Sequence, residues 1–196
     1  ALMDGSEQPM VVKLPLMDGQ IRTRYELDGD DWRDRHIFPY KPEEIEAVSI
    51  EYPQQRNKGF KLKKNSGKWD ISPFYDNVPI INKPVSEGKV EGFLYGFEGL
   101  TAETFNNEYT HKDSIRQMIP FSVISITDNK GKEKKAAFYS TYKTDKFTGE
   151  RRNDIVERFY TETNEGDWLI TQLGVFKKVF WAYDSFFEAN DKALKK

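Results

Sequence analysis

Apolar residues recur at every second position in several short stretches of this chain, and this alternation constrains its fold more than any other feature. The apolar members of residues 48–52 alternate with Ser49 and Glu51, and Phe60 and Leu62 alternate with lysines. A period of two places successive side chains on opposite faces of an extended chain. Each stretch therefore predicts a β-strand with one face buried and one face in water.

Turn sequences between these stretches indicate an antiparallel meander. Residues 65–67 (Asn-Ser-Gly) form a turn signal, and Trp69 and Ile71 follow on one face of the next strand. Further strands are expected at residues 10–14, 21–25, 121–127, 135–142, 155–163 and 168–173. The chain is therefore predicted to belong to the α+β class, with antiparallel sheet.

Two segments have the spacing of amphipathic helices. Between residues 85 and 100, Val90, Phe93, Leu94 and Phe97 lie three or four positions apart. Glycines at positions 88, 92 and 96 share one face of this helix, which we expect to pack closely against another backbone. A second helix is expected over residues 175–187. Each helix is predicted to cover a sheet.

Two sequence segments suggest an internal duplication. Residues 67–72 (Gly-Lys-Trp-Asp-Ile-Ser) and 166–171 (Gly-Asp-Trp-Leu-Ile-Thr) are similar, and a helix is expected after each. The similarity predicts a repeated unit of three strands and a helix; convergence on common turn sequences is the alternative. We expect residues 1–43 to hold N-terminal strands and a charged Trp-Arg turn. Residues 44–106 and 107–196 are then two meander units, each ending in a helix.

The composition permits a core but excludes several chemistries. The chain has 196 residues, of which 37% are hydrophobic and 14% aromatic. A domain of this length buries enough surface to fold without covalent crosslinks. The absence of cysteine excludes disulfide scaffolds, thiolate metal sites and cysteine nucleophiles. The net charge of -2 creates no overall field that attracts nucleic acid or anionic lipid.

Catalytic motifs are also missing from the sequence. The two histidines, His36 and His111, lack the spacing of a zinc-binding helix, and no Gly-x-Ser-x-Gly or phosphate-binding loop sequence is present. A glycosidase-type carboxylate pair stays open, because the separation of two carboxylates is a property of the fold. We expect a protein that is not an enzyme, with no catalytic residue, no metal and no cofactor.

A tryptophan flanked by charges is the first candidate binding surface. The aspartates around it do not follow the calcium-loop pattern, and helix capping with local ion pairs explains them. A tryptophan beside guanidinium groups is typical of a protein-interface hot spot. We predict a partner-binding surface formed by Asp31, Trp32, Arg33, Asp34 and Arg35. The alternative is a corner of the fold in which Trp32 plugs the core.

Lys61 and Lys63 form the second candidate surface, for an anionic partner. They belong to a basic stretch, residues 56–68, that contains no acid. Such a ribbon can contact phosphate groups. The interpretation we prefer is protection of an exposed strand against edge-to-edge pairing, because no aromatic residues interleave to stack bases. Nucleic acid is therefore not an expected partner.

Several motifs occur in an order that resembles a known family. They are Pro9-Met10-Val11-Val12, Asp31-Trp32-Arg33-Asp34-Arg35-His36, Pro42-Glu43-Glu44-Ile45, Val48-Ser49-Ile50-Glu51-Tyr52-Pro53 and Lys112-Asp113-Ser114-Ile115. In order and spacing the chain resembles the Bacteroidetes branch of the domain-of-unknown-function family 4340. The resemblance covers most of the chain and is loose after Thr141.

The resemblance implies a location and a kind of function. Proteins of this family usually carry an N-terminal membrane helix or lipoprotein-type anchor, which would precede residue 1, and a domain outside the cytoplasm. Relatives are associated with transporter or gliding-motility gene sets. We therefore expect a periplasmic or cell-envelope accessory or scaffold domain that binds a protein partner and touches the membrane only through such an anchor. The alternative is a carbohydrate- or small-ligand-binding domain, or a hydrolase, that uses exposed aromatics and a carboxylate pair.

Overall fold

The computed structural model describes residues 4–5, 7–8, 29–141, 143–144, 148, 151–152 and 156–188. The chain divides into two compact units, residues 1–34 and residues 35–196. The strands predicted at residues 10–14 and 21–25 lie outside the described residues. Both predicted meander units fall within the second compact unit.

The elements of the second unit are mostly strands. The strands are β1 (Ile45–Glu51), β2 (Phe60–Asn65), β3 (Lys68–Pro73), β4 (Thr104–Phe105), β5 (Ser122–Asp128), β6 (Glu133–Ser140), β7 (Lys143–Thr144), β8 (Arg151–Arg152), β9 (Arg158–Thr163) and β10 (Trp168–Gln172). The α-helices are α1 (Glu87–Tyr95), α2 (Lys112–Arg116) and α3 (Leu173–Phe176). Short 3-10 helices are η3 (Pro42–Glu44), η4 (Arg56–Lys58) and η5 (Tyr183–Phe186), and the first unit contains η2 (Gly29–Trp32).

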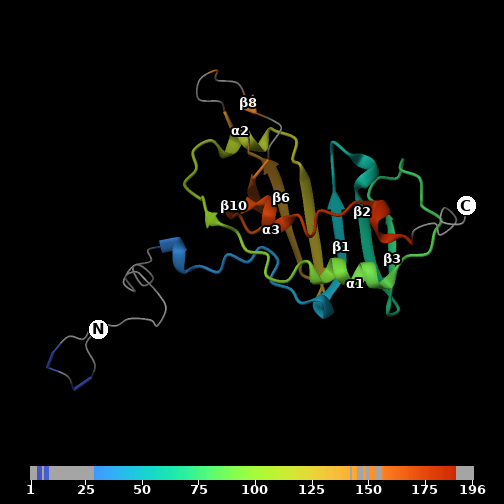
Figure 1. Cartoon of the computed structure of the whole chain (residues 1–196), viewed down its shortest axis with the longest axis horizontal. Helices are drawn as coiled ribbons and strands as arrows, with labels where there is room; N and C mark the ends of the chain where they lie inside the picture. The colour runs from blue at the N-terminus through green and yellow to red at the C-terminus, as the bar shows by residue number, and fades with distance from the viewer. Residues whose placement is uncertain are drawn as a thin grey trace, which may run out of the picture. The chain divides into compact units, whose positions relative to one another are not determined.

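The strands form one antiparallel sheet of eight strands in the order β3-β2-β1-β5-β6-β9-β10-β4, and β7 pairs with β8 separately. β1 and β5 join the two predicted meander units, with Ser49 opposite Ser125 and Ile50 opposite Ile124. Figure 1 shows β1, β2 and β3 in one half of the molecule and β6 and β10 in the other. The predicted antiparallel, sheet-rich α+β fold is confirmed, but both units contribute to a single sheet.

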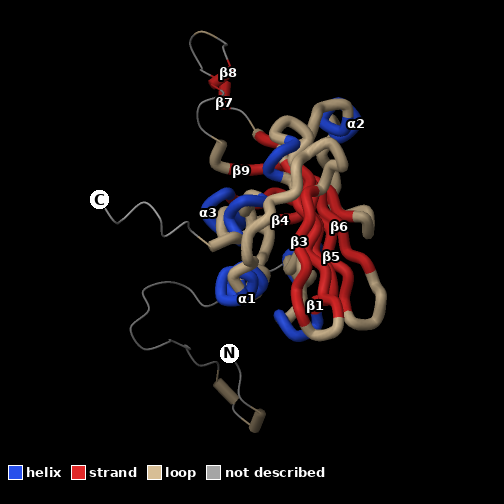
Figure 2. The backbone as a smooth tube through the Cα atoms, turned by 90° about the vertical axis from the view of Figure 1, so that its right-hand side faces the viewer, coloured by secondary structure: helices blue, strands red, loops and turns tan. Residues whose placement is uncertain are grey.

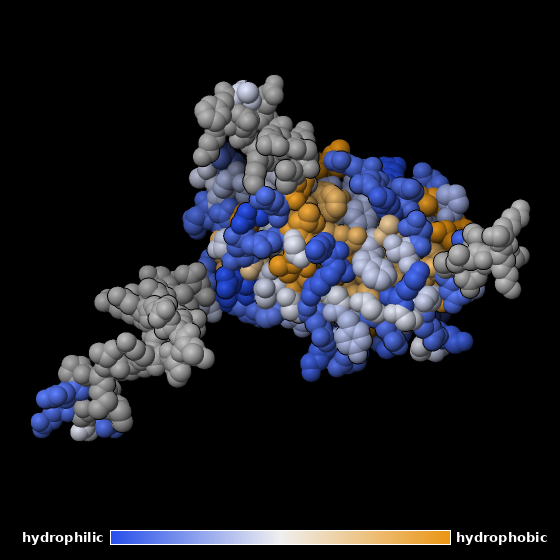
Figure 3. All heavy atoms as spheres, in the orientation of Figure 1, coloured by the Kyte–Doolittle hydropathy of each residue, from blue (hydrophilic) through white to orange (hydrophobic). Residues whose placement is uncertain are grey.

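The core lies on one face of this sheet. Figure 2 shows α1 and α3 on the same side of the strands, which we call the covered face. Phe93 of α1 lies at the centre of an aromatic cluster, and its ring centroid is 5.5 Å from Phe60, 5.2 Å from Phe97 and 5.1 Å from Phe186. These contacts are edge-to-face, the arrangement that aromatic rings favour. Figure 3 views the covered face, where apolar side chains gather across the middle between hydrophilic ones.

The predicted single helix over residues 175–187 is wrong. Only α3 and η5 are helical there, with an irregular stretch between them. This segment crosses the sheet, because Phe176 packs 5.3 Å from Phe138 of β6 and Phe186 packs 4.7 Å from Phe60 of β2. Its many β-branched and aromatic residues have modest helix propensity, so tertiary packing decides the backbone.

The two similar tryptophan segments do not occupy equivalent positions. Trp69 of β3 packs against the core. Trp168 pairs with Glu162, whereas the core-facing Leu169 pairs with Thr161, so Trp168 lies on the opposite face. We call that face, opposite α1 and α3, the open face. The structure thus gives no support to the duplicated unit.

The predicted close approach of the glycine face of α1 is wrong for two of its three members. Gly88 and Gly92 are exposed, and a Cβ atom at either position would meet nothing within 4 Å. Only Gly96 is tightly packed. The reason is that α1 turns Val90, Phe93 and Leu94 toward the sheet instead.

Candidate functional site

The turn around Trp32 presents its indole to solvent. Trp32 ends η2 and is 63% exposed. Within this turn the Arg33 guanidinium lies 3.1 Å from the Asp30 carboxylate, and the Arg33 backbone N–H donates to the Asp30 carbonyl. The side chain of Asp31 lies outside the described residues. The alternative in which Trp32 plugs the core is therefore wrong, although Arg33 does pair locally.

The five residues of this predicted surface divide between the two compact units. Asp34 is the last residue of the first unit and Arg35 the first of the second. Arg35 donates a 2.6 Å hydrogen bond from Nη1 to the Glu103 carbonyl, and its own carbonyl accepts from the Ala102 N–H. Arg35 is thereby tied to the segment that leads into β4. Within the first unit the described surface consists of Trp32, Arg33 and Asp34.

Lys61 and Lys63 lie on the open face of an inner strand. β2 has β1 on one side and β3 on the other, and β3 is the edge of the sheet. The edge-protection interpretation is therefore wrong for these lysines, because β2 has no free edge. Together with Asn65, Asp70 and Ser72 they line a cavity of about 380 Å³. The sequence predicted the exposure of both lysines but not the cavity.

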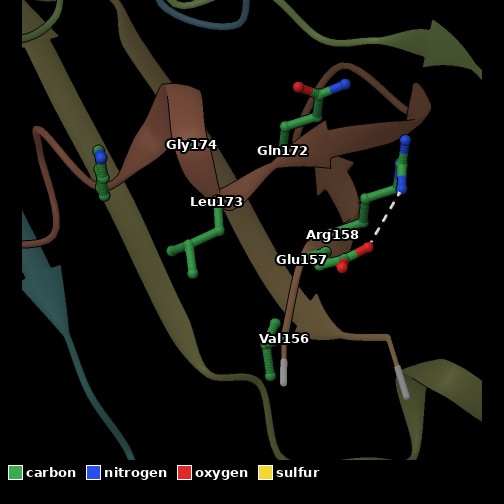
Figure 4. A pocket seen from close by; sticks show the side chains of 7 residues that line it. Val156, Glu157, Arg158, Gln172, Leu173 and Gly174 are labelled. Atoms are coloured by element: carbon green, nitrogen blue, oxygen red, sulfur yellow. Dashed lines mark ion pairs between the residues drawn. The ribbon is translucent and has the colours of Figure 1, made fainter. Parts of the chain in front are cut away.

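A second cavity, of about 420 Å³, lies where β9 begins and β10 ends. Figure 4 shows Val156 and Leu173 pointing into it, with Glu157, Arg158 and Gln172 beside them. No motif or local pattern in the sequence marked these positions. They meet only because β9 and β10 pair, with Gln172 opposite Arg158.

Arg158, one of the residues that line this second cavity, forms an ion pair with Glu103. Arg158 donates from Nε and Nη2 to the two Glu103 carboxylate oxygens, at 2.6 and 3.1 Å. These bonds, with a further hydrogen bond from Gln172, hold the pKa of Glu103 below its usual value. Both charges are therefore neutralised within the chain, and Glu157 of the same lining also pairs with Arg158, at 3.8 Å.

A third cavity, of about 390 Å³, contains His36 together with Tyr40, Lys41 and Glu98. His36 is exposed there, and in the part of the chain that the structure describes no three His, Asp or Glu side chains are grouped to hold a metal ion. The other histidine, His111, packs edge-on against Tyr109 at 5.7 Å.

A row of aromatic side chains lies on the open face, and no local sequence pattern predicted it. Trp168 stacks near-parallel on Tyr139 (6.0 Å) and on Tyr160 (6.1 Å), and Tyr109 stacks on Tyr160 at 4.9 Å. Arg116 of α2 lies 5.7 Å from the Trp168 ring centre. Because the rings stack on one another and Trp168 is 1% exposed, this row is a small second core.

No protein-family model matches this chain, and no curated protein or solved structure shows significant similarity to it. The resemblance to family 4340 therefore stays a prediction that rests on its sequence motifs. None of the helices among the described residues combines the length and the apolarity that crossing a bilayer requires.

Proposed function

We propose that this protein is a non-enzymatic accessory or scaffold domain of the cell envelope, and that it binds a partner protein through the turn around Trp32. The observation that carries the proposal is the exposure of this one indole. Trp168 is buried, and Trp69 and Trp181 are half-buried against the core. A large aromatic side chain in water, beside an arginine, matches the composition of interface hot spots.

The envelope location and the link to a transporter or gliding-type complex rest on the family resemblance. In that setting the membrane contact is made by an N-terminal anchor, and the partner is a neighbouring envelope protein. No cofactor, metal or nucleic acid is part of the proposal.

Photo-crosslinking in intact cells tests this function. A photoreactive phenylalanine analogue replaces Trp32 in one variant and Tyr95 in the control, because Tyr95 is similarly exposed at 61%. We expect one dominant crosslinked protein from position 32, found in the envelope fraction, and none from position 95. Trp32→Ala should abolish co-purification of the same protein.

Two outcomes would contradict the proposal. Equal crosslinking from both positions would show that exposure alone governs capture. A crosslinked protein recovered only from the cytoplasmic fraction would contradict the proposed location.

The carbohydrate-binding alternative needs exposed, coplanar aromatics next to a pair of carboxylates. The near-parallel aromatics of the open face are Tyr139, Tyr160, Trp168 and Tyr109. Of these, Tyr139 and Trp168 are buried. Glu162 beside them is bound by Arg116 at 2.6 Å. This geometry favours protein binding over glycan binding.

A further inference from the structure

We propose that the open face of the β2–β3 hairpin holds a second binding site, which takes an acidic, extended segment of a protein between Lys61, Lys63 and Ser72. This site belongs to the second compact unit and does not depend on Trp32. It also gives Lys61 and Lys63 a role that their inner position would not otherwise explain.

The lysines have few carboxylates as neighbours on the sheet. Opposite charges directly across from each other on neighbouring strands stabilise a sheet. Lys61 lies between Ser49 of β1 and Ser72 of β3. Its ammonium group lies 5.2 Å from the ring centre of Phe74. The cross-strand neighbours of Lys61 thus leave its charge without a carboxylate.

Lys63 has a similar environment. Its cross-strand neighbours are Ala47 and Asp70. The Asp70 carboxylate accepts a hydrogen bond from Asn65 Nδ2 at 3.2 Å. Among the described residues no ion pair within 4.0 Å joins Lys63 to Asp70, and the cavity of about 380 Å³ lies among these side chains.

Short side chains beside long ones create the space. Ser72, which lies opposite Lys61, is too short to fill the volume next to the two lysines, so the lysines border a trough between β2 and β3. Its volume falls within the range of about 300–1,000 Å³ that is common for binding pockets. The trough therefore has both the charge and the room to receive a ligand group.

The positive and negative side chains at the trough determine which kind of ligand can bind there. The two ammonium groups attract a carboxylate, and the Ser72 hydroxyl can donate to it. Asp70, in contrast, accepts hydrogen bonds and repels a compact dianion such as phosphate. An acidic peptide carries carboxylates for the lysines and backbone N–H groups for Asp70, so it matches both sides of the trough.

Fluorescence anisotropy with defined probes tests the site. The probe is a labelled peptide of alternating Glu and Ser, and the same peptide with Gln in place of Glu is its control. We expect the Glu peptide to bind, the Gln peptide not to bind, and added salt to weaken binding because the contacts are exposed ion pairs. Unlabelled inorganic phosphate and a single-stranded DNA oligonucleotide are tested as competitors.

Three variants locate the site. Lys61→Gln/Lys63→Gln should weaken peptide binding by at least about tenfold. Ser72→Glu retains both lysines but supplies a carboxylate beside Lys61, so it should also weaken binding. Lys83→Gln/Lys130→Gln removes two other exposed lysines and should leave binding unchanged. The urea midpoint of each variant confirms that it folds.

The outcomes separate the possibilities. Unchanged binding by the double Lys→Gln variant or by Ser72→Glu would overturn the site, and so would phosphate or DNA that displaces the peptide more strongly than unlabelled Glu peptide does. Trp32→Ala should retain peptide binding, so failure of the crosslinking experiment and failure of this one are distinguishable.

Discussion

Tyr160, on the open face, has a raised pKa because of its surroundings in the folded chain. Burial of its hydroxyl, together with a hydrogen bond and charge interaction with Tyr109, raises the pKa of Tyr160 from the ordinary value of 10.0 to about 12. Burial is also the main reason that the pKa values of Tyr40, Tyr52 and Tyr139 are raised. In each case the fold favours the neutral phenol over the phenolate.

Because the pKa of Tyr160 is higher in the folded state than in the unfolded state, the protein should lose stability at alkaline pH. Below pH 10.0 Tyr160 is protonated in both states, whereas between pH 10.0 and about 12 only its unfolded form ionises. The free energy of unfolding should therefore be insensitive to tyrosine ionisation below pH 10.0 and should fall as the pH rises toward 12. Urea midpoints across this range measure it, and a midpoint that rises with pH would contradict the assignment.

The variant Tyr109→Phe tests whether Tyr109 contributes to the raised pKa of Tyr160. The variant retains the stacked ring but removes the hydroxyl, so the pKa of Tyr160 should move part of the way back toward 10.0, because burial remains. Absorbance titration of the phenolates measures the change. Tyr95→Phe removes an exposed hydroxyl elsewhere and should leave the titration of Tyr160 unaltered.

At the scale of the element, α1 and its C-cap contain glycines in opposite environments. A Cβ atom at Gly96 would lie 3.0 Å from the Lys178 carbonyl oxygen and 3.1 Å from Val179 Cγ1, whereas a Cβ atom at Gly92 would meet nothing within 4 Å. Gly96 has an ordinary helical φ of -58°. A side chain at position 96 would therefore collide with the Phe93 carbonyl oxygen, at 2.8 Å, and with the segment that follows α3.

Alanine at the two positions should have opposite effects. Gly92→Ala should stabilise the protein by about 0.5–1 kcal/mol, because alanine is the better helix former. Gly96→Ala should destabilise it by about 1–3 kcal/mol, because the extra methyl overpacks the contact. Urea unfolding measures both; equal stabilisation by both would mean that residues 178–179 do not press on α1.

At the scale of the whole molecule, the second compact unit is held together across its middle. β1 pairs with β5 along most of its length. The segment after α3 also contacts the first half, since the Ser86 N–H donates to the Phe186 carbonyl at 2.9 Å and Val85 forms an isolated bridge with Phe187. Neither half can bury its apolar face without the other.

The second unit should therefore unfold in a single transition. Tryptophan fluorescence and far-UV circular dichroism should give the same urea midpoint, which is the signature of two-state behaviour. Fragments 35–106 and 107–196 should each be unfolded alone and should recover sheet structure on mixing. A folded isolated fragment or two separate midpoints would instead support independent meander units.

The sequence predicted individual elements well where the local pattern is strong. The alternation around Val48, Ile50, Phe60 and Leu62 identified β1 and β2, and the helical spacing around Phe93 identified α1. Most of the remaining strands of the large sheet also lie where alternation and turn residues placed them. The spacing of apolar residues along a strand or helix is a local property, so it can be recognised in a single sequence.

The candidate sites could be predicted from the sequence only in part. The charged residues around Trp32 and the solvent-facing positions of Lys61 and Lys63 could be predicted from the sequence. The cavity beside those lysines depends on Asp70 and Ser72, which come from the neighbouring strand β3. The stacked row around Trp168 combines side chains from β6, β9, β10 and the segment before α2. No local sequence pattern predicts that these side chains meet.

By itself, the sequence determined the class of fold, the faces of most strands and the absence of cysteine chemistry, because periodicity and composition are local properties. Only the tertiary structure decided that both halves share one sheet, that Lys61 and Lys63 lie on an inner strand, and that residues 177–182 are irregular. Each of these depends on which distant segments pair and how aromatic side chains fill the space between them. Packing of that kind is a property of the folded chain as a whole.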